Sequence, residues 1–199
     1  MNQICSCTFV AKDASYMALT YSSMLELGTK IPDFKLVNSL DQQVFSSSKL
    51  NNDRPSLLMV ICNHCPYVIH YNEELQQLAH DYAREIDFVA ISSNDVDRYP
   101  QDGPIEMKKL FEKIGLDFPY LYDETQEVSK YLQAECTPEF YLYDSNNVLV
   151  YRGRLDASSP GKDIPITGID LRSAIEALLR GDDISSDQHP SMGCSIKWK

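Results

Sequence analysis

The stretch that decides the fold is residues 56–66, which read Ser-Leu-Leu-Met-Val-Ile-Cys-Asn-His-Cys-Pro. The six residues before the first cysteine are largely aliphatic, and such a run predicts a buried strand. Pro66 suits the first turn of a helix. Apolar residues then recur at spacings of three and four over residues 68–82, which predicts an amphipathic helix. Cys62 and Cys65 therefore lie where a buried strand gives way to a helix.

Two cysteines three positions apart can close a small disulfide ring or supply two ligands of a metal ion. The free N–H groups at a helix N-terminus stabilise a thiolate, so this setting favours redox chemistry. Metal binding is the alternative, in which Cys136 and Cys194 complete a four-thiolate set. His64 or His189 could then replace one thiolate. A structural zinc site usually presents two close cysteine pairs, whereas Cys136 and Cys194 are single cysteines, so the sequence favours a dithiol without a metal.

The composition is that of a soluble globular domain. The chain has 199 residues, of which 43% are hydrophobic and 24% charged, enough to bury one full core. Its formal net charge of -11 argues against nucleic acid or an anionic membrane surface as a partner. No segment approaches the roughly 20 apolar residues that span a bilayer, and residues 1–10 lack the positive charge of a signal peptide. We therefore expect a cytoplasmic protein, whose six cysteines are mostly reduced.

The remaining pattern predicts a mixed sheet layered with helices. Helical crossovers imply parallel strands in the middle of the sheet, and a late hairpin implies an antiparallel edge. Ligands of such sheets gather beyond the carboxyl ends of the parallel strands, so Asn94 and Asp95 are expected on the same face as the cysteine pair. The predicted elements are strands at 35–37, 43–45 and 56–61, a helix at 65–84, a strand at 86–91, helices starting at Pro104 and Asp123, strands at 139–143 and 148–151, and a helix starting at Thr167.

Three features of the chain resemble the thioredoxin superfamily, in a peroxiredoxin-like, AhpC/TSA-redoxin type of domain. They are Gly28 with Pro32-Asp33-Phe34, Cys62-Asn-His-Cys65-Pro66, and Thr137-Pro138 before the late hairpin. The resemblance implies an α/β thioredoxin-like fold, with a mixed central β-sheet flanked by helices and an added N-terminal β-hairpin. It divides the chain into an N-terminal extension at 1–16, a thioredoxin-like domain at 17–182 and a C-terminal tail at 183–199.

The resemblance also implies roles for the cysteine pair and the turn. Cys62 would be the exposed nucleophile, and Cys65 the resolving thiol buried beneath it. Thr137-Pro138 would be a cis-proline turn that lies against the pair and offers the backbone of Thr137 to an extended substrate. Asn63 and His64, between the cysteines, would tune the thiols or bind substrate, since a protonated histidine favours a thiolate and makes the disulfide more oxidising.

Two further cysteines are candidates for the same site. Cys136 lies two positions before Pro138 and is expected near the pair, either as a third redox thiol or as a small buried residue. Cys194 lies in the tail beside Gly193, which gives flexibility, and is either an additional resolving thiol or a free surface thiol.

The sequence thus predicts a thiol–disulfide oxidoreductase in cell redox homeostasis, and an antioxidant role only for the peroxidase alternative. Its substrate would be a protein or small-molecule disulfide, a separate thiol reductant would recycle it, and no cofactor is required. A thiol peroxidase is the alternative, with peroxide as substrate. The peroxiredoxin motif places a Thr or Ser three positions before the cysteine and a Pro seven before; Pro55 fits, but Met59 replaces the hydroxyl. A metal-binding module using the same cysteines is the third hypothesis.

Overall fold

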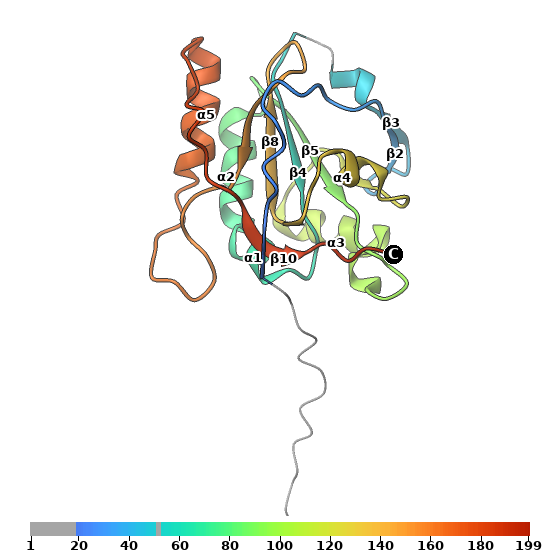
Figure 1. The fold of residues 1–199 in the computed structure, drawn as a ribbon. Helices are drawn as coiled ribbons and strands as arrows, with labels where there is room; N and C mark the ends of the chain where they lie inside the picture. The colour runs from blue at the N-terminus through green and yellow to red at the C-terminus, as the bar shows by residue number, and fades with distance from the viewer. Residues whose placement is uncertain (1–18, 51–52) are drawn as a thin grey trace, which may run out of the picture.

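The computed structural model describes residues 19–50 and 53–199, so Cys5, Cys7 and the extension predicted at 1–16 lie outside the described residues. Its centre is a mixed sheet with the strand order β3-β2-β6-β5-β4-β8-β9 (Figure 1). The pairs β4–β5 and β5–β6 are parallel and the others antiparallel, which confirms the predicted sheet. The strands are β2 (Lys35–Asn38), β3 (Val44–Ser46), β4 (Ser56–Val60), β5 (Asp87–Ser92), β6 (Tyr120–Tyr122), β8 (Glu139–Tyr143) and β9 (Leu149–Gly153).

Helices cover both faces of the sheet, which is why every residue of β4 and β8 is buried. Leu57 and Met59 of β4 pack towards four helices on one face, and Leu58 and Val60 pack towards one short helix on the other. Figure 1 shows α2 and α5 on one side of the central strands and α4 on the other. The helices are α1 (Pro66–His70), α2 (Asn72–Tyr82), α3 (Pro104–Ile114) and α5 (Ile169–Arg180) on the first face and α4 (Glu127–Tyr131) on the second; η1 (Ser47–Leu50) and η2 (Pro100–Asp102) are short 3-10 helices.

The helix predicted at 65–84 is two helices in the structure, α1 and α2, which meet at Tyr71. The backbone of Tyr71 leaves the helical region, with φ −97° and ψ 1°. Its buried hydroxyl donates a hydrogen bond to the Ser158 carbonyl oxygen at 2.7 Å and lies 3.3 Å from the Asp156 carboxylate, a second acceptor. A buried tyrosine needs such a partner, so these two acceptors hold the side chain where the helix breaks.

A second, smaller sheet contains the segment that the sequence assigned to a separate tail. Strand β10 (Met192–Ser195) lies antiparallel between β1 (Leu19–Tyr21) and β7 (Cys136–Thr137). Cys194 and Ile196 are buried in the hydrophobic cores of the two faces. The last residues of the chain are therefore part of the fold, and Cys194 is not a surface thiol.

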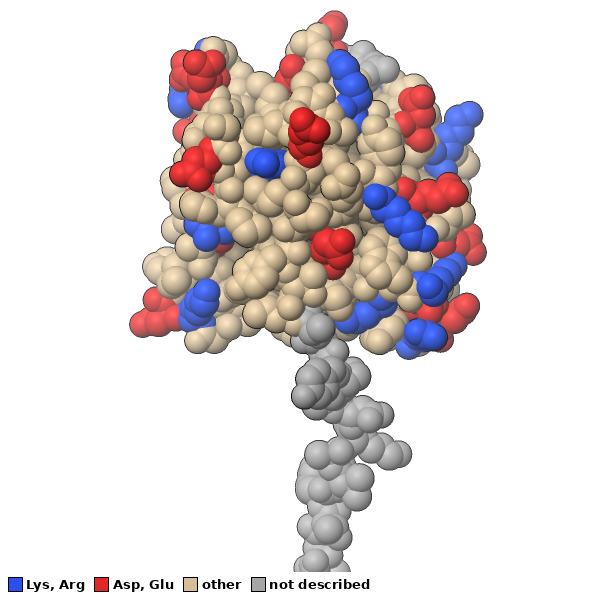
Figure 2. Space-filling view, viewed as in Figure 1, with Lys and Arg blue, Asp and Glu red and all other residues tan. Residues whose placement is uncertain are grey.

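The surface is mixed in charge. On the face seen in Figure 2, acidic and basic side chains lie mainly at the edges, and only a few separate charged side chains lie in the middle. None of the helices in the described part of the chain is both long and apolar enough to cross a membrane.

Candidate active site

The cysteine pair lies at the carboxyl end of β4, and Cys65 is the residue from which α1 begins. Asn94, in the loop after β5, reaches the same face, and its side chain contacts the same carboxylate as His64, that of Asp102. The sequence predicted this shared face from the parallel pairing of β4 and β5.

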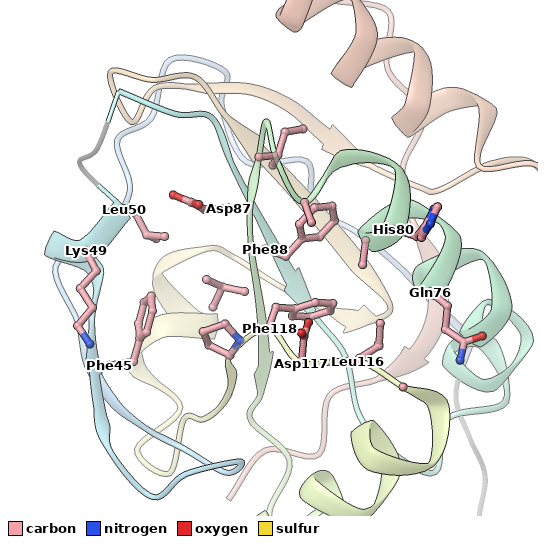
Figure 3. Close-up of a pocket in the computed structure, with 16 residues that line it drawn as sticks. Phe45, Lys49, Leu50, Gln76, His80, Asp87, Phe88, Leu116, Asp117 and Phe118 are labelled. Carbon is pink, nitrogen blue, oxygen red and sulfur yellow. The ribbon is translucent and has the colours of Figure 1, made fainter.

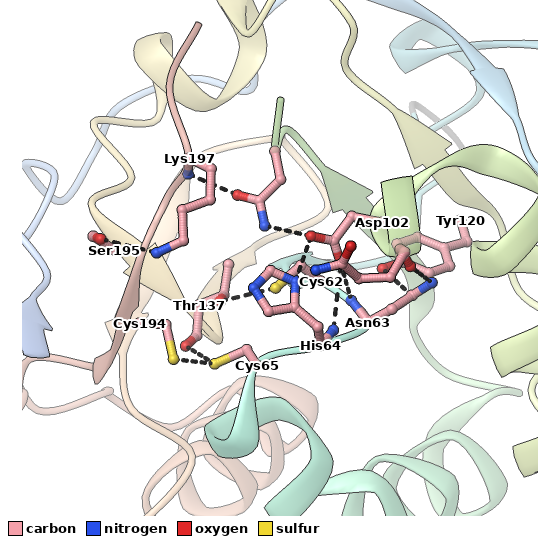
Figure 4. Close-up of polar contacts among 12 residues, drawn as sticks. Cys62, Asn63, His64, Cys65, Asp102, Tyr120, Thr137, Cys194, Ser195 and Lys197 are labelled. Carbon is pink, nitrogen blue, oxygen red and sulfur yellow. Dashed lines mark hydrogen bonds and ion pairs between the residues drawn. The ribbon is translucent and has the colours of Figure 1, made fainter. Parts of the chain in front are cut away.

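Three of the four cysteines in the described ranges form one cluster, and none of the four is in a disulfide. Cys65 Sγ lies 2.9 Å from Cys194 Sγ and 3.1 Å from the carbonyl oxygen of Thr137 (Figure 4). Cys62 Sγ lies 3.4 Å from the hydroxyl oxygen of Thr137. Thr137 therefore touches both members of the pair, one through its side chain and one through its backbone.

The Thr137-Pro138 peptide bond is cis, as the resemblance implies. The expected exposure of Cys62, however, is wrong, because only 2% of the residue is accessible. The expectation that the Thr137 backbone is open to an extended substrate is also wrong, because Thr137 pairs with Cys194 in the β7–β10 ladder. This approach requires a glycine at position 193, where a Cβ would lie 2.0 Å from the Thr137 carbonyl oxygen.

Hydrogen bonding among the sulfurs shifts the pKa values of the three thiols in opposite directions. Hydrogen bonds from the Cys194 and Cys62 thiols lower the pKa of Cys65. The pKa of Cys62 is raised well above its ordinary value, first by its hydrogen bond with Cys65, then by burial and by the Asp102 carboxylate. The Cys65 hydrogen bond and burial likewise raise the pKa of Cys194. These shifts favour Cys65 over Cys62 and Cys194 as the first of the three thiols to ionise.

A fully buried carboxylate, Asp102, organises the turn between the two cysteines. Its Oδ1 accepts hydrogen bonds from the backbone N–H groups of Asn63 (2.8 Å) and His64 (3.3 Å). Its Oδ2 lies 2.6 Å from His64 Nδ1 and accepts a hydrogen bond from Asn94 Nδ2 at 2.9 Å. His64 also stacks on Tyr99, with ring centroids 5.5 Å apart. This role of Asp102 is not predictable from the sequence, because an Asp between two prolines in a loop is typical of a turn.

The C-terminal segment and one core tyrosine complete this polar network. Asn94 Oδ1 accepts a hydrogen bond from the backbone N–H of Lys197 at 2.8 Å. The Tyr120 hydroxyl donates to Asn63 Oδ1 at 3.2 Å. Asp95, the other predicted loop residue, donates its backbone N–H to the carbonyl oxygen of Lys197 at 2.8 Å. The loop after β5 thus joins the cysteine turn to the end of the chain.

Cys136 belongs to a different environment. Its sulfur lies 3.9 Å from Glu139 Oε2, because successive residues of β7 point to opposite sides of the strand. Burial raises the pKa of Cys136 well above its ordinary value, and burial raises the pKa of Glu139 to about 7. Cys136 is therefore a buried thiol that resists ionisation, and the four-thiolate metal set considered from the sequence does not form.

A different donor set could accept a metal ion. Cys62 Sγ, a ring nitrogen of His64 and a carboxylate oxygen of Asp102 lie within 4.8 Å of one another. Zinc accepts sulfur, nitrogen and oxygen ligands of these kinds. In the structure, two of the three groups bond directly to each other, the His64 ring and the Asp102 carboxylate.

Two cavities lie at opposite ends of the sheet. One, of about 590 Å³, surrounds the start of β5 (Figure 3) and contains none of the cysteines. The other, of about 230 Å³, adjoins the cis-proline turn and β10, and its lining includes Tyr71, Pro138, Arg154, His189 and Met192. Of these two cavities, the smaller one borders the candidate site.

Solved structures resemble this chain over most of its length. A conserved protein of Geobacillus kaustophilus has a TM-score of 0.90 and 49% identity, covering 92% of this chain and 98% of its own. A protein of Sinorhizobium meliloti 1021 has a TM-score of 0.87 and 39% identity, covering 90% and 98%. A secreted disulfide oxidoreductase of Mycobacterium tuberculosis has a TM-score of 0.58 and 18% identity, covering 73% and 96%, and supports the thioredoxin-like fold alone.

Among curated proteins, none matches the chain. The family model described as the AhpC/TSA family matches residues 27–152, which include β4, the cysteine pair and the cis-proline turn. This match covers more than half of the sequence and confirms the resemblance drawn from the cysteine pair and the Thr137-Pro138 turn. The chain therefore belongs to the AhpC/TSA family, whose members combine the thioredoxin-like fold with thiol chemistry.

Proposed function

We propose that this protein is a thiol–disulfide oxidoreductase that uses Cys62 and Cys65 as its redox dithiol. The observation that carries the proposal is the contact of both sulfurs with Thr137 of the cis-proline turn, at the start of α1. Membership of the AhpC/TSA family supports the same chemistry. A disulfide of a protein or small molecule is the substrate, and a separate thiol reductant recycles the pair.

The reaction passes two electrons from the dithiol to a substrate disulfide. Cys62 Sγ attacks one substrate sulfur, which forms a mixed disulfide and breaks the substrate S–S bond, so that the other substrate sulfur leaves as a thiolate. Cys65 Sγ then attacks Cys62 Sγ, which releases the second substrate sulfur and leaves a Cys62–Cys65 disulfide. The substrate becomes two thiols, and the external reductant returns two electrons to the pair.

The pKa order of the two thiols suits a proton transfer between them. Hydrogen bonds from Cys194 and Cys62 lower the pKa of Cys65, whereas the hydrogen bond with Cys65 and burial raise the pKa of Cys62. Cys65 therefore carries the charge at rest and accepts the Cys62 proton as Cys62 attacks. The proton then passes to the first departing sulfur, which restores the Cys65 thiolate for the second step.

The test is reduction of insulin disulfides by a catalytic amount of protein, with dithiothreitol as the recycling reductant. Cys62→Ser should fall to the uncatalysed rate, and Cys65→Ser should accumulate the mixed disulfide. Cys7→Ser, which removes a thiol outside the described residues, is the matched control and should keep the wild-type rate. Wild-type activity in Cys62→Ser would refute the assignment. Stoichiometric zinc or copper in protein purified without added metal would favour a metal-binding function instead.

One observation favours a second candidate function, reduction of peroxide. The Thr137 hydroxyl lies 3.4 Å from Cys62 Sγ, so the fold supplies near this sulfur a hydroxyl that the sequence lacks at Met59. A hydrogen peroxide consumption assay separates the two functions. A peroxidase would consume peroxide at micromolar concentration and would form a sulfinic acid on Cys62 when peroxide is in excess.

A further inference from the structure

The C-terminal strand holds a third thiol against the dithiol. Cys194 Sγ lies 2.9 Å from Cys65 Sγ, and Cys194 is itself only 2% exposed. A disulfide bond is about 2.05 Å long, so closing a bond between these sulfurs needs a movement of about 1 Å. Among the cysteines that the structure describes, Cys136 has no such contact, since its sulfur faces Glu139.

The position of Cys194 is fixed on both sides. Strand β10 pairs with β7 through Cys194 and Ser195 and with β1 along its other edge. Beyond the strand, the backbone N–H of Ile196 donates to the Glu135 carbonyl oxygen at 3.0 Å, and that of Lys197 donates to Asn94 Oδ1 at 2.8 Å. These contacts therefore hold Cys194 in one position, beside Cys65 and away from the surface.

We propose that Cys194 is a third redox thiol, which moves the disulfide from Cys62–Cys65 to Cys65–Cys194. This inference rests on the proposed oxidoreductase function, which first forms the Cys62–Cys65 bond at the expense of a substrate disulfide. The Cys194 thiolate attacks Cys65 Sγ, the Cys65–Cys194 bond forms, and the Cys62–Cys65 bond breaks. Cys62 leaves as a thiolate and takes up the proton that Cys194 gave up, so the exchange needs no further oxidant.

The charges around Cys194 suit this step. In the reduced cluster the hydrogen bond with Cys65 and burial raise the pKa of Cys194, and the charge on Cys65 raises it further. Both contributions of Cys65 depend on its being a thiol or thiolate, so they end once Cys65 is in a disulfide. The Lys197 ammonium group, whose charge does not depend on Cys65, lowers the pKa of Cys194. Oxidation of the pair therefore makes Cys194 a better nucleophile, directed at the nearest sulfur.

The experiment maps disulfides after oxidation by glutathione disulfide. Reduced full-length protein is treated with glutathione disulfide, quenched in acid, alkylated and digested with trypsin. Cys62 and Cys65 share one tryptic peptide, residues 50–84, whereas Cys194 lies in residues 181–197. The inference predicts a cross-link between the two peptides, with Cys62 alkylated. Cys194→Ser should convert the whole oxidised fraction to the Cys62–Cys65 form, and Ser195→Ala, the matched change in β10, should retain the cross-link.

The outcomes separate this inference from the proposed function. A Cys62–Cys65 disulfide alone, with Cys194 fully alkylated, would overturn the relay and leave the oxidoreductase function standing. Failure to form either disulfide would overturn both. The decisive measurement is the disulfide map of the wild-type protein, so the test remains valid even if a variant folds poorly.

Discussion

The Asp102→Asn substitution tests the buried network that supports the cysteine turn. Asp102 is fully buried and interacts with four nitrogen atoms, two through each carboxylate oxygen. An asparagine keeps one oxygen. If this oxygen stays on the backbone N–H groups of Asn63 and His64, the new NH₂ group faces the side-chain NH₂ of Asn94, and two donors meet. The His64 ring can adapt by changing tautomer, but the side-chain amide of Asn94 cannot flip without losing the hydrogen bond from the backbone N–H of Lys197.

The free energy of unfolding should fall by about 3–5 kcal/mol in this variant. A buried donor left without an acceptor costs about 1–3 kcal/mol, and the two surviving hydrogen bonds each lose about 1 kcal/mol when their acceptor loses its charge. Urea unfolding at pH 7 measures the change. Asp97→Asn, an exposed residue of the same loop, is the control and should stay within about 0.5 kcal/mol of the wild type.

The Asp102→Asn substitution should also change the pKa of Cys62. The hydrogen bond with Cys65, burial and the Asp102 carboxylate all raise the pKa of Cys62. In a background with Cys65→Ser and Cys194→Ser, removal of the carboxylate should therefore lower the pKa of Cys62, measured from the pH dependence of iodoacetamide alkylation. An unchanged or higher pKa, together with wild-type stability, would refute the role given to Asp102.

Three further predictions follow from contacts around the turn and β10. Gly193→Ala should cost about 2 kcal/mol or more and speed alkylation of Cys194, because its Cβ would meet the Thr137 carbonyl oxygen at 2.0 Å and push β10 away. Thr137→Val should slow alkylation of Cys62, whose pKa is raised mainly by Cys65 and burial but lowered by the Thr137 hydroxyl. Burial raises the pKa of Glu139 from 4.5 to about 7, so the folded state binds this proton more tightly than the unfolded state does. The free energy of unfolding should therefore fall by up to about 3 kcal/mol as the pH rises from 4.5 to 7. Urea unfolding of Glu139→Gln over the same pH range should lack that fall.

The central part of the fold could be predicted because its signals are local. The aliphatic run before Cys62 has no polar interruption, so it could only be a strand buried on both faces, and β4 is such a strand. The strands β1, β7 and β10 were missed, since each has two to four residues and no alternating pattern. Their pairing depends on the distant partner rather than on their own sequence.

The candidate site likewise has a part that could be predicted from the sequence and a part that could not. The cysteines, the two residues between them and the cis-proline turn are recognisable because they stand together in short motifs. The contacts of Asp102 and Cys194 are not recognisable from the sequence. Asp102 lies 38 positions from its partner His64, and Cys194 lies 129 positions from its partner Cys65. A lone Asp in a loop and a lone Cys near the end of a chain carry no pattern that names a partner, and only the packed structure brings them to the thiols.

The place of Cys194 in the sequence also sets the order in which the site is assembled. Cys194 and Lys197 are among the last six residues, whereas Cys62 and Cys65 lie in the first half of the chain. During synthesis the N-terminal part of a domain emerges first. The cysteine pair therefore leaves the ribosome before β10 exists to cover it, and the buried three-sulfur cluster closes only once Cys194 has also emerged.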